Sequence, residues 1–162
     1  MNIVLIGFPG AGKSTVGRRL ADKLGMGFID LDLYIEEKYR TAVPLLFQKY
    51  GEPAFRALEY AALCEVLDMD NVVIATGGGA PCHGDAMERI NTNAISIYLQ
   101  LTEDQLVERL LHSKKKRPLT NSHSEPEVRA YVHDTLAIRE PYDLRATRVW
   151  TPEEADGLPF PV

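Results

Sequence analysis

The sequence predicts an α/β fold in which helices cover both faces of a five-stranded parallel sheet, giving three layers of α/β/α type. Short apolar runs of strand length alternate along the chain with longer stretches of helical periodicity. The first apolar run, residues 3–6, leads at once into a glycine-rich loop and then a helical stretch. With 162 residues and 45% hydrophobic content, the chain is expected to form a single domain over 1–162.

The glycine-rich loop has the spacing of a phosphate-binding P-loop. It runs from Gly7 to Thr15 as Gly-Phe-Pro-Gly-Ala-Gly-Lys-Ser-Thr and fits the pattern G-x-x-x-x-G-K-[ST]. Its glycines let backbone N–H groups approach phosphate oxygens, and the N-terminus of the next helix adds partial positive charge. Lys13 can reach the outer phosphates, and the Ser14 hydroxyl can hold a bridging magnesium ion. The predicted nucleoside triphosphate site consists of Gly10, Ala11, Gly12, Lys13, Ser14 and Thr15.

A helix, a strand and another helix follow the loop. Apolar residues recur every four positions over residues 16–24 and predict a helix, which Gly25 ends. Residues 28–29 predict the second strand, and a helical pattern resumes over 33–39.

Two aspartates, Asp30 and Asp32, stand where the second strand ends. In an open parallel sheet ligands bind beyond the carboxyl ends of the strands, so these carboxylates are expected beside the P-loop. One of them can approach magnesium, while the other can accept a hydrogen bond from a substrate hydroxyl. The alternative is that they only cap the next helix, a position that aspartate favours.

Residues 43–50 and 52–67 predict two helices separated at Gly51. On the second of these, Arg56 and Glu59 lie three residues apart on one face. They form either an exposed ion pair of little energetic weight or a site in which Arg56 offers its planar guanidinium to a substrate carboxylate.

The third strand, residues 71–75, is followed by Thr76 and three consecutive glycines, Gly77, Gly78 and Gly79. Bare backbone at the same sheet edge as the P-loop predicts that a ligand approaches there. A plain tight turn is the alternative, because turns use glycine freely.

The last third of the chain predicts two strands, two helices and a lid. Residues 94–99 form the fourth strand, and Thr102 caps a helix that carries Arg109 on its exposed side. The polar segment 112–126 has no period of its own and is interpreted as a mobile lid that closes over triphosphate and brings Arg117 to the transferred group. The remaining predictions are a helix over 127–140 ended by Pro141, a strand over 148–150 and an irregular tail over 151–162.

Composition excludes several classes of protein. A net charge of −5 and a pI near 5.4 argue against nucleic acid as the main partner. The chain has neither an apolar run of 18 residues nor a signal-like start, so no membrane association and a cytoplasmic location are expected. Cys64 and Cys82 show no metal-type spacing and are interpreted as reduced thiols. Because nothing in the sequence demands an oligomer, a monomer is expected.

Together these segments resemble the shikimate kinases, P-loop enzymes of the nucleoside monophosphate kinase fold, and the resemblance runs in order to about Trp150. It is carried by the P-loop at 7–15, Phe28-Ile-Asp-Leu-Asp32, Gly51-Glu-Pro-Ala-Phe-Arg56 with Glu59, Gly77-Gly-Gly79, Arg117-Pro-Leu119 and Arg139-Glu-Pro-Tyr142. Two features depart from the family pattern. The lid reads Arg117-Pro-Leu-Thr120, where the family more often has a second apolar residue. The stretch Val43-Pro-Leu-Leu-Phe47 lacks the acidic residue that is common before its Phe.

The resemblance implies ATP-dependent phosphorylation of the 3-hydroxyl of shikimate, a step toward chorismate and the aromatic amino acids. Lys13 and the lid residue Arg117 would contact the phosphates of ATP, and Arg109 would lie against its adenine. Mg²⁺ would be held by Ser14 and Asp30.

The resemblance also implies an acceptor site. Asp32 would meet the shikimate hydroxyls and orient or deprotonate the acceptor, while Arg56 and Arg139 would hold the carboxylate. Gly77, Gly78 and Gly79 would line the same pocket. The implied catalytic residues are Lys13, Asp32 and Arg117.

Two other functions remain open. The first is another small-molecule P-loop kinase with a nucleotide or gluconate acceptor, since the loop also resembles that of adenylate kinase, although the three glycines and the two carboxylate-directed arginines do not belong to that alternative. The second is a nucleotide-binding module that has lost transfer, which would require a missing working residue.

Overall fold

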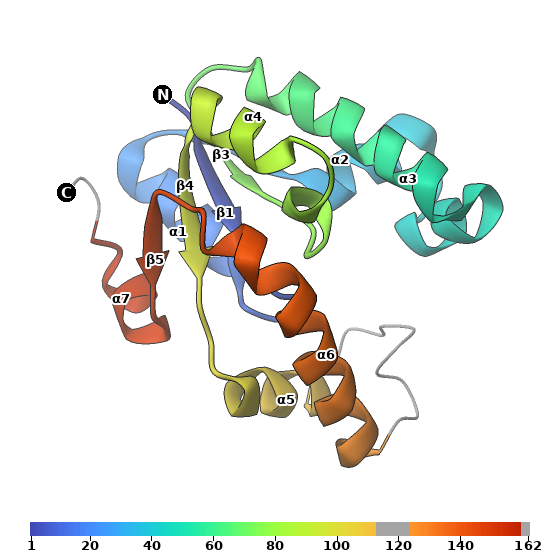
Figure 1. The fold of residues 1–162 in the computed structure, drawn as a ribbon. Coiled ribbons are helices and arrows are strands. Elements are labelled where there is room, and N and C mark those ends of the chain that lie inside the picture. The colour runs from blue at the N-terminus through green and yellow to red at the C-terminus, as the bar shows by residue number, and fades with distance from the viewer. Residues whose placement is uncertain (113–123, 160–162) are drawn as a thin grey trace.

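The computed structural model describes residues 1–112 and 124–159, and these form one parallel sheet of five strands in the order β2-β3-β1-β4-β5 (Figure 1). The strands are β1 (Ile3–Ile6), β2 (Gly27–Asp30), β3 (Val72–Ala75), β4 (Ile95–Leu99) and β5 (Arg148–Trp150). All five predicted strands are thereby confirmed, each to within one residue at either end. β1 is central, paired with β3 on one side and β4 on the other.

In the same ranges the chain forms seven α-helices and one short 3₁₀ helix, η1 (Ala80–Cys82). The helices are α1 (Lys13–Leu24), α2 (Leu31–Tyr39), α3 (Val43–Leu67), α4 (Ala86–Asn93), α5 (Glu103–Leu111), α6 (Glu125–Asp143) and α7 (Pro152–Gly157). α3 is broken as the sequence predicts, because Gly51 inside it has non-helical dihedrals (φ 79, ψ 169).

Alternate residues of β1 face opposite cores, which explains the three layers. Ile3 and Leu5 are fully buried in a cluster with residues of α1, α5, α6 and α7. Val4 and Ile6 are fully buried in a second cluster with residues of α2, α3 and α4. Because both faces of this strand are covered, its sequence is a continuous apolar run and not an alternating one.

Two predictions need correction, and one helix was not predicted. The tail is not wholly irregular: α7 begins after Thr151, whose hydroxyl and the Glu154 carboxylate form a capping box. Pro141 does not end α6, because a proline so close to the last turn removes only one helical hydrogen bond, and the helix continues to Asp143. α4 was not predicted, although its apolar residues Ala86, Met87 and Ile90 are buried on one face.

The parallel sheet brings three loops to one edge. The P-loop follows β1, Asp30 ends β2, and the glycine loop that we define as Gly77–Gly79 follows β3. Asp30 pairs in register with Ala75, and the Thr76 hydroxyl donates to the Leu5 carbonyl oxygen at 3.0 Å. The three segments singled out from the sequence therefore meet at the carboxyl ends of neighbouring strands. Among the described residues, no helix combines the length and apolar character needed to cross a membrane.

Candidate active site

The P-loop has the backbone conformation that its glycines permit. Gly10 and Gly12 have φ of 90° and 94°, in the left-handed region that side chains disfavour. Gly12 is the N-cap of α1, so the helix begins at Lys13 with its first N–H groups free of helical acceptors. This arrangement of donors at a helix N-terminus is suited to binding phosphate.

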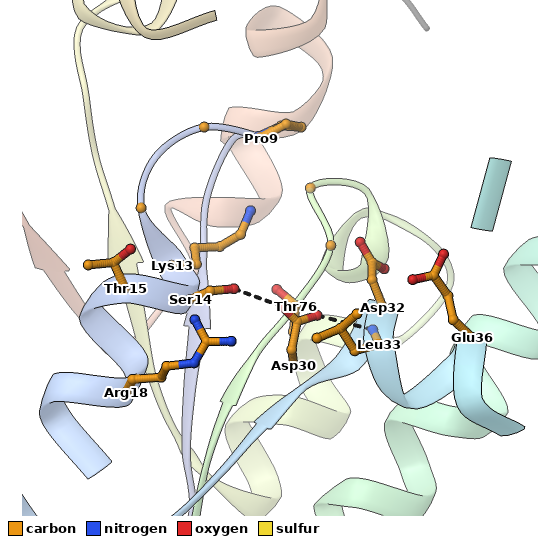
Figure 2. Close-up of a pocket in the computed structure, with 14 residues that line it drawn as sticks. Pro9, Lys13, Ser14, Thr15, Arg18, Asp30, Asp32, Leu33, Glu36 and Thr76 are labelled. Carbon is orange, nitrogen blue, oxygen red and sulfur yellow. Dashed lines mark hydrogen bonds between the residues drawn. The ribbon is translucent and has the colours of Figure 1, made fainter. Parts of the chain in front are cut away.

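Lys13 is buried and is held by the loop itself. Its ammonium donates hydrogen bonds to the carbonyl oxygens of Gly7 at 2.5 Å and Phe8 at 3.3 Å. Figure 2 shows its Nζ directed into the space between the P-loop and the segment around Thr76. The side chain is therefore placed in the concavity that phosphate oxygens would enter.

Ser14 and Asp30 meet across the site. The Ser14 hydroxyl donates to Asp30 Oδ2 at 2.7 Å, and Asp30 Oδ1 accepts from the Leu33 N–H at 3.2 Å (Figure 2). Asp30 is thus the N-cap of α2 and also contacts Ser14 of the P-loop, so its capping role does not exclude the predicted role beside magnesium. A hydroxyl and a carboxylate, both hard oxygen donors, beside a phosphate-binding loop fit Mg²⁺.

The glycine loop packs against the three side chains predicted to bind the substrate. A Cβ on Gly77 would lie 2.9 Å from Asp32 Oδ1. A Cβ on Gly78 would lie 2.9 Å from Arg139 Nη1, and one on Gly79 would lie 2.6 Å from Arg56 Nη2. The structure therefore brings Asp32, Arg56 and Arg139 together around one loop, adjacent to Pro9 of the P-loop.

None of these three glycines has a positive φ, so backbone conformation does not require them. Real Cβ atoms almost never come within 3.0 Å of a neighbouring atom, and the space that a Cβ would need is filled by a carboxylate, two guanidinium groups and, at Gly78, the Pro9 ring. Gly77–Gly79 is accordingly glycine because these side chains lie against it.

Arg56 is held in place by a buried partner. Its Nη1 lies 2.7 Å from Glu59 Oε1, and the exposed fractions of the two side chains are 16% and 5%. Its guanidinium also lies over the rings of Phe47 and Phe55 at 5.6 and 5.5 Å. Burial raises the pKa of Glu59, an effect that Arg56 opposes. The pair is not the exposed ion pair that the sequence left open; it fixes the orientation of a guanidinium.

Arg139 presents an unused donor. Its Nη1 is buried and has no hydrogen-bond partner within the described part of the chain, while its guanidinium lies 5.9 Å from the Phe8 ring centroid. A buried guanidinium N–H without an acceptor is costly unless a ligand supplies one. A substrate carboxylate would satisfy it.

A cavity of about 450 Å³ joins the P-loop to the glycine loop, and Figure 2 shows its lining residues. It includes Lys13, Ser14, Asp30 and Asp32 as predicted. Sequence reasoning missed Pro9, Arg18, Leu33, Glu36 and Thr76. Two of these had a readable signal, because Arg18 follows Ser14 by four residues and Glu36 follows Asp32 by four, so each shares a helix face with a predicted site residue.

The predicted adenine and lid residues differ in their outcome. Arg109 is exposed on α5, and its Nη1 donates to the Gly10 carbonyl oxygen at 3.2 Å, so it lies against the P-loop. Arg117 and most of the predicted lid, residues 113–123, lie outside the described residues. The last two positions of the predicted lid, 125–126, belong to α6.

Comparisons with known proteins agree with this geometry. The family model for shikimate kinase matches residues 9–153. A shikimate kinase from Parabacteroides distasonis is 41% identical over 152 residues, which cover 94% of this chain and 88% of that protein. Residues 9–153 include Lys13, Ser14, Asp30, Asp32, Arg56, Gly77, Gly78, Gly79, Arg109, Arg117 and Arg139.

Solved structures of shikimate kinases are also similar to this chain. The crystal structure of shikimate kinase from Bacteroides thetaiotaomicron superposes with a TM-score of 0.93 at 37% identity, covering 98% of this chain and 93% of the other. The structure from Acinetobacter baumannii, solved in complex with shikimate, has a TM-score of 0.81 at 38% identity and covers 92% and 82% of the two chains. The chain therefore belongs to the shikimate kinase family.

Proposed function

We propose that this chain transfers the γ-phosphoryl group of ATP to the 3-hydroxyl of shikimate, giving shikimate 3-phosphate and ADP on the route to chorismate and the aromatic amino acids. One observation carries the proposal. Next to the P-loop, a single glycine loop holds a carboxylate, Asp32, and two guanidinium groups, those of Arg56 and Arg139. A hydroxylated carboxylic acid is the acceptor that such a set would bind, and the Acinetobacter baumannii relative was solved with shikimate.

The acceptor end of the reaction depends on positioning. Arg139, with its unpaired Nη1, and Arg56, braced by Glu59, would take the substrate carboxylate through charge-assisted hydrogen bonds, and two planar groups fix its orientation. Asp32 would then accept a hydrogen bond from the 3-hydroxyl and take its proton as the oxygen attacks phosphorus. Holding the reacting atoms in line supplies much of the rate enhancement in such transfers.

The phosphate end depends on charge. Lys13 and the N–H groups at the start of α1 would bind the β- and γ-phosphates, and Arg117 would add a further cation. Ser14 and Asp30 would hold Mg²⁺, which when bound supplies charge neutralisation at the phosphate oxygens. Arg109 would lie against the adenine.

ADP release with MgATP, measured separately with shikimate, quinate, gluconate and AMP, tests the proposal. We expect turnover with shikimate and at most a small fraction of that rate with the other three. Turnover with gluconate or AMP alone would support a P-loop kinase but contradict shikimate as its acceptor. No ADP release with any of the four, alongside tight ATP binding, would favour a nucleotide-binding module without transfer.

We further propose that the chain acts in the cytoplasm, where ATP is supplied, and as a monomeric single domain, because the proposed site is built from this one chain. Light scattering coupled to gel filtration should give the mass of one chain, 18.1 kDa. A mass of twice that value would reject the monomer.

A further inference from the structure

Asp143, in the last turn of α6, is a buried carboxyl that the proposed mechanism does not use. The residue is 2% exposed, and its Oδ1 is buried without a hydrogen-bond partner in residues 1–112 and 124–159. It follows Arg139 by four residues, so the two side chains lie on the same face of the helix. A buried carboxylate usually has its oxygens hydrogen-bonded, so this position needs an explanation.

The charged and titratable groups that act on Asp143 come from four elements. They are Arg139 and Glu140 of α6, Lys13 of α1, Cys82 of η1 and Tyr98 of β4. Burial raises the pKa of the Asp143 carboxyl to about 7, while Lys13 and then Arg139 oppose this rise. Burial also raises the pKa of the Cys82 thiol to about 12 and that of the Tyr98 hydroxyl further above its usual value, so both stay neutral near pH 7.

The two cations that act on Asp143 are the same two that would bind the anionic groups of the ligands. Lys13 is placed for the phosphates of ATP, and Arg139 for the carboxylate of shikimate. Each ligand therefore brings a second anion toward a buried carboxylate, and two close anions in a poorly solvated site disfavour double ionisation. The Tyr98 hydroxyl donates a hydrogen bond to Glu140 Oε2 at 2.8 Å, and the negative charge of Glu140 also raises the pKa of Asp143.

We propose that Asp143 couples the binding of the anionic ligands to the uptake of a proton. As the shikimate carboxylate pairs with Arg139, or the ATP phosphates pair with Lys13, the Asp143 carboxylate takes one proton from the buffer and becomes the neutral acid. No bond to the ligand is formed or broken. The inference rests on the proposed function, and by linkage it predicts tighter ligand binding at lower pH.

Calorimetric titration with shikimate near neutral pH, in Pipes and in Tris, measures the proton uptake, because the two buffers differ in ionisation enthalpy. Shikimate suits this test since its carboxyl stays ionised throughout the neutral range. We expect uptake of up to one proton, and a dissociation constant that rises by up to about tenfold between pH 6 and pH 8.5. In Asp143→Asn, which keeps the size of the side chain, uptake should vanish and the dissociation constant should become nearly independent of pH.

His83→Gln is the matched control. Burial and Arg56 lower the pKa of His83, so a carboxylate arriving at Arg56 could also draw a proton to that ring. We expect this variant to keep the uptake. Uptake that is lost in His83→Gln and kept in Asp143→Asn, or absent from the wild-type chain, would overturn the proposal.

A second measurement needs no variant to fold. The ¹³Cγ resonance of Asp143 in the wild-type chain should titrate near neutral pH and shift its midpoint upward when shikimate is added, and an acidic, ligand-independent midpoint would overturn the proposal. No heat with shikimate would contradict the proposed function instead. A Mg²⁺-bound, non-hydrolysable ATP analogue would then test the proton uptake. Its binding should take up more protons in the wild-type chain than in Asp143→Asn, and equal uptake in the two would overturn the proposal.

Discussion

At the scale of single residues, Asp32 is the side chain on which the proposed transfer depends most. Its carboxylate lies against Gly77 and lines the cavity, where an acceptor hydroxyl would bind. Asp32→Asn should keep the fold and ATP binding while lowering kcat by at least about a hundredfold, because the amide cannot take the proton. Steady-state ADP release gives kcat, and calorimetry with ATP supplies the control. Turnover close to that of the wild-type chain would remove Asp32 from the mechanism.

Arg139 tests the carboxylate site. Arg139→Lys keeps the charge but loses the planar pair of donors, so KM for shikimate should rise by about tenfold to a hundredfold while KM for ATP changes little. Arg145→Lys is a matched control on the same stretch of chain, since that side chain is 46% exposed and lies 3.8 Å from Glu88. Equal effects of the two substitutions on KM for shikimate would contradict the assignment.

Residue roles could be predicted from sequence where a motif fixes the neighbours, and not where tertiary packing decides. Lys13 and Ser14 follow from the P-loop pattern alone. Asp30 left two interpretations open that only the coordinates could combine, because helix capping and P-loop contact use its two carboxylate oxygens separately. Asp143 follows Arg139 by four residues and so shares its helix face, but this spacing does not tell whether the carboxyl is buried.

At the scale of elements, the glycine loop lies between the proposed phosphate and acceptor sites. Gly79→Ala should raise KM for shikimate by about tenfold or more, because its Cβ would displace the Arg56 guanidinium. Enzyme kinetics measures this effect. Gly157→Ala is the control, because a Cβ there meets nothing within 4 Å. Unchanged kinetics in Gly79→Ala would show that Arg56 does not need its observed position.

The glycine loop also shows where element-level prediction falls short. Its position at the sheet edge followed correctly from the parallel strands. The sequence predicts that a ligand approaches the bare backbone of this loop, which stays a prediction, but it does not indicate that the glycines also make room for side chains from α2, α3 and α6. Packing between distant segments is not encoded in any local pattern. α7, by contrast, had a readable start in Thr151 and Pro152 that the interpretation as a tail overlooked.

At the scale of the whole molecule, the parallel sheet of five strands could be anticipated because strands buried on both faces appear as uninterrupted apolar runs, whereas the order of the strands was not predicted. The layers followed from their alternation with helices. What could not be anticipated is the electrostatic balance of the centre, where a buried carboxyl shares two cations with the expected ligands.

That balance predicts how stability depends on pH. The pKa of Asp143 is raised from 3.8 to about 7 in the folded chain, so the native state binds this proton more tightly than the unfolded state. Its contribution to the free energy of unfolding is therefore full below about pH 4 and is lost as the pH rises through about 7. Thermal unfolding should show Asp143→Asn gaining in Tm relative to the wild-type chain between pH 5 and pH 8. A Tm difference that does not change with pH would contradict this.

The position of the transferred phosphate is the sharpest test of the proposed acceptor site, because it reports both the acceptor and the way the site holds it. The product of a reaction with MgATP and shikimate can be examined by ³¹P–¹H correlation spectroscopy. We predict a single product with phosphorus coupled to the proton on carbon 3. Phosphate on another hydroxyl, or only inorganic phosphate, would contradict the arrangement of Asp32, Arg56 and Arg139 as the acceptor site.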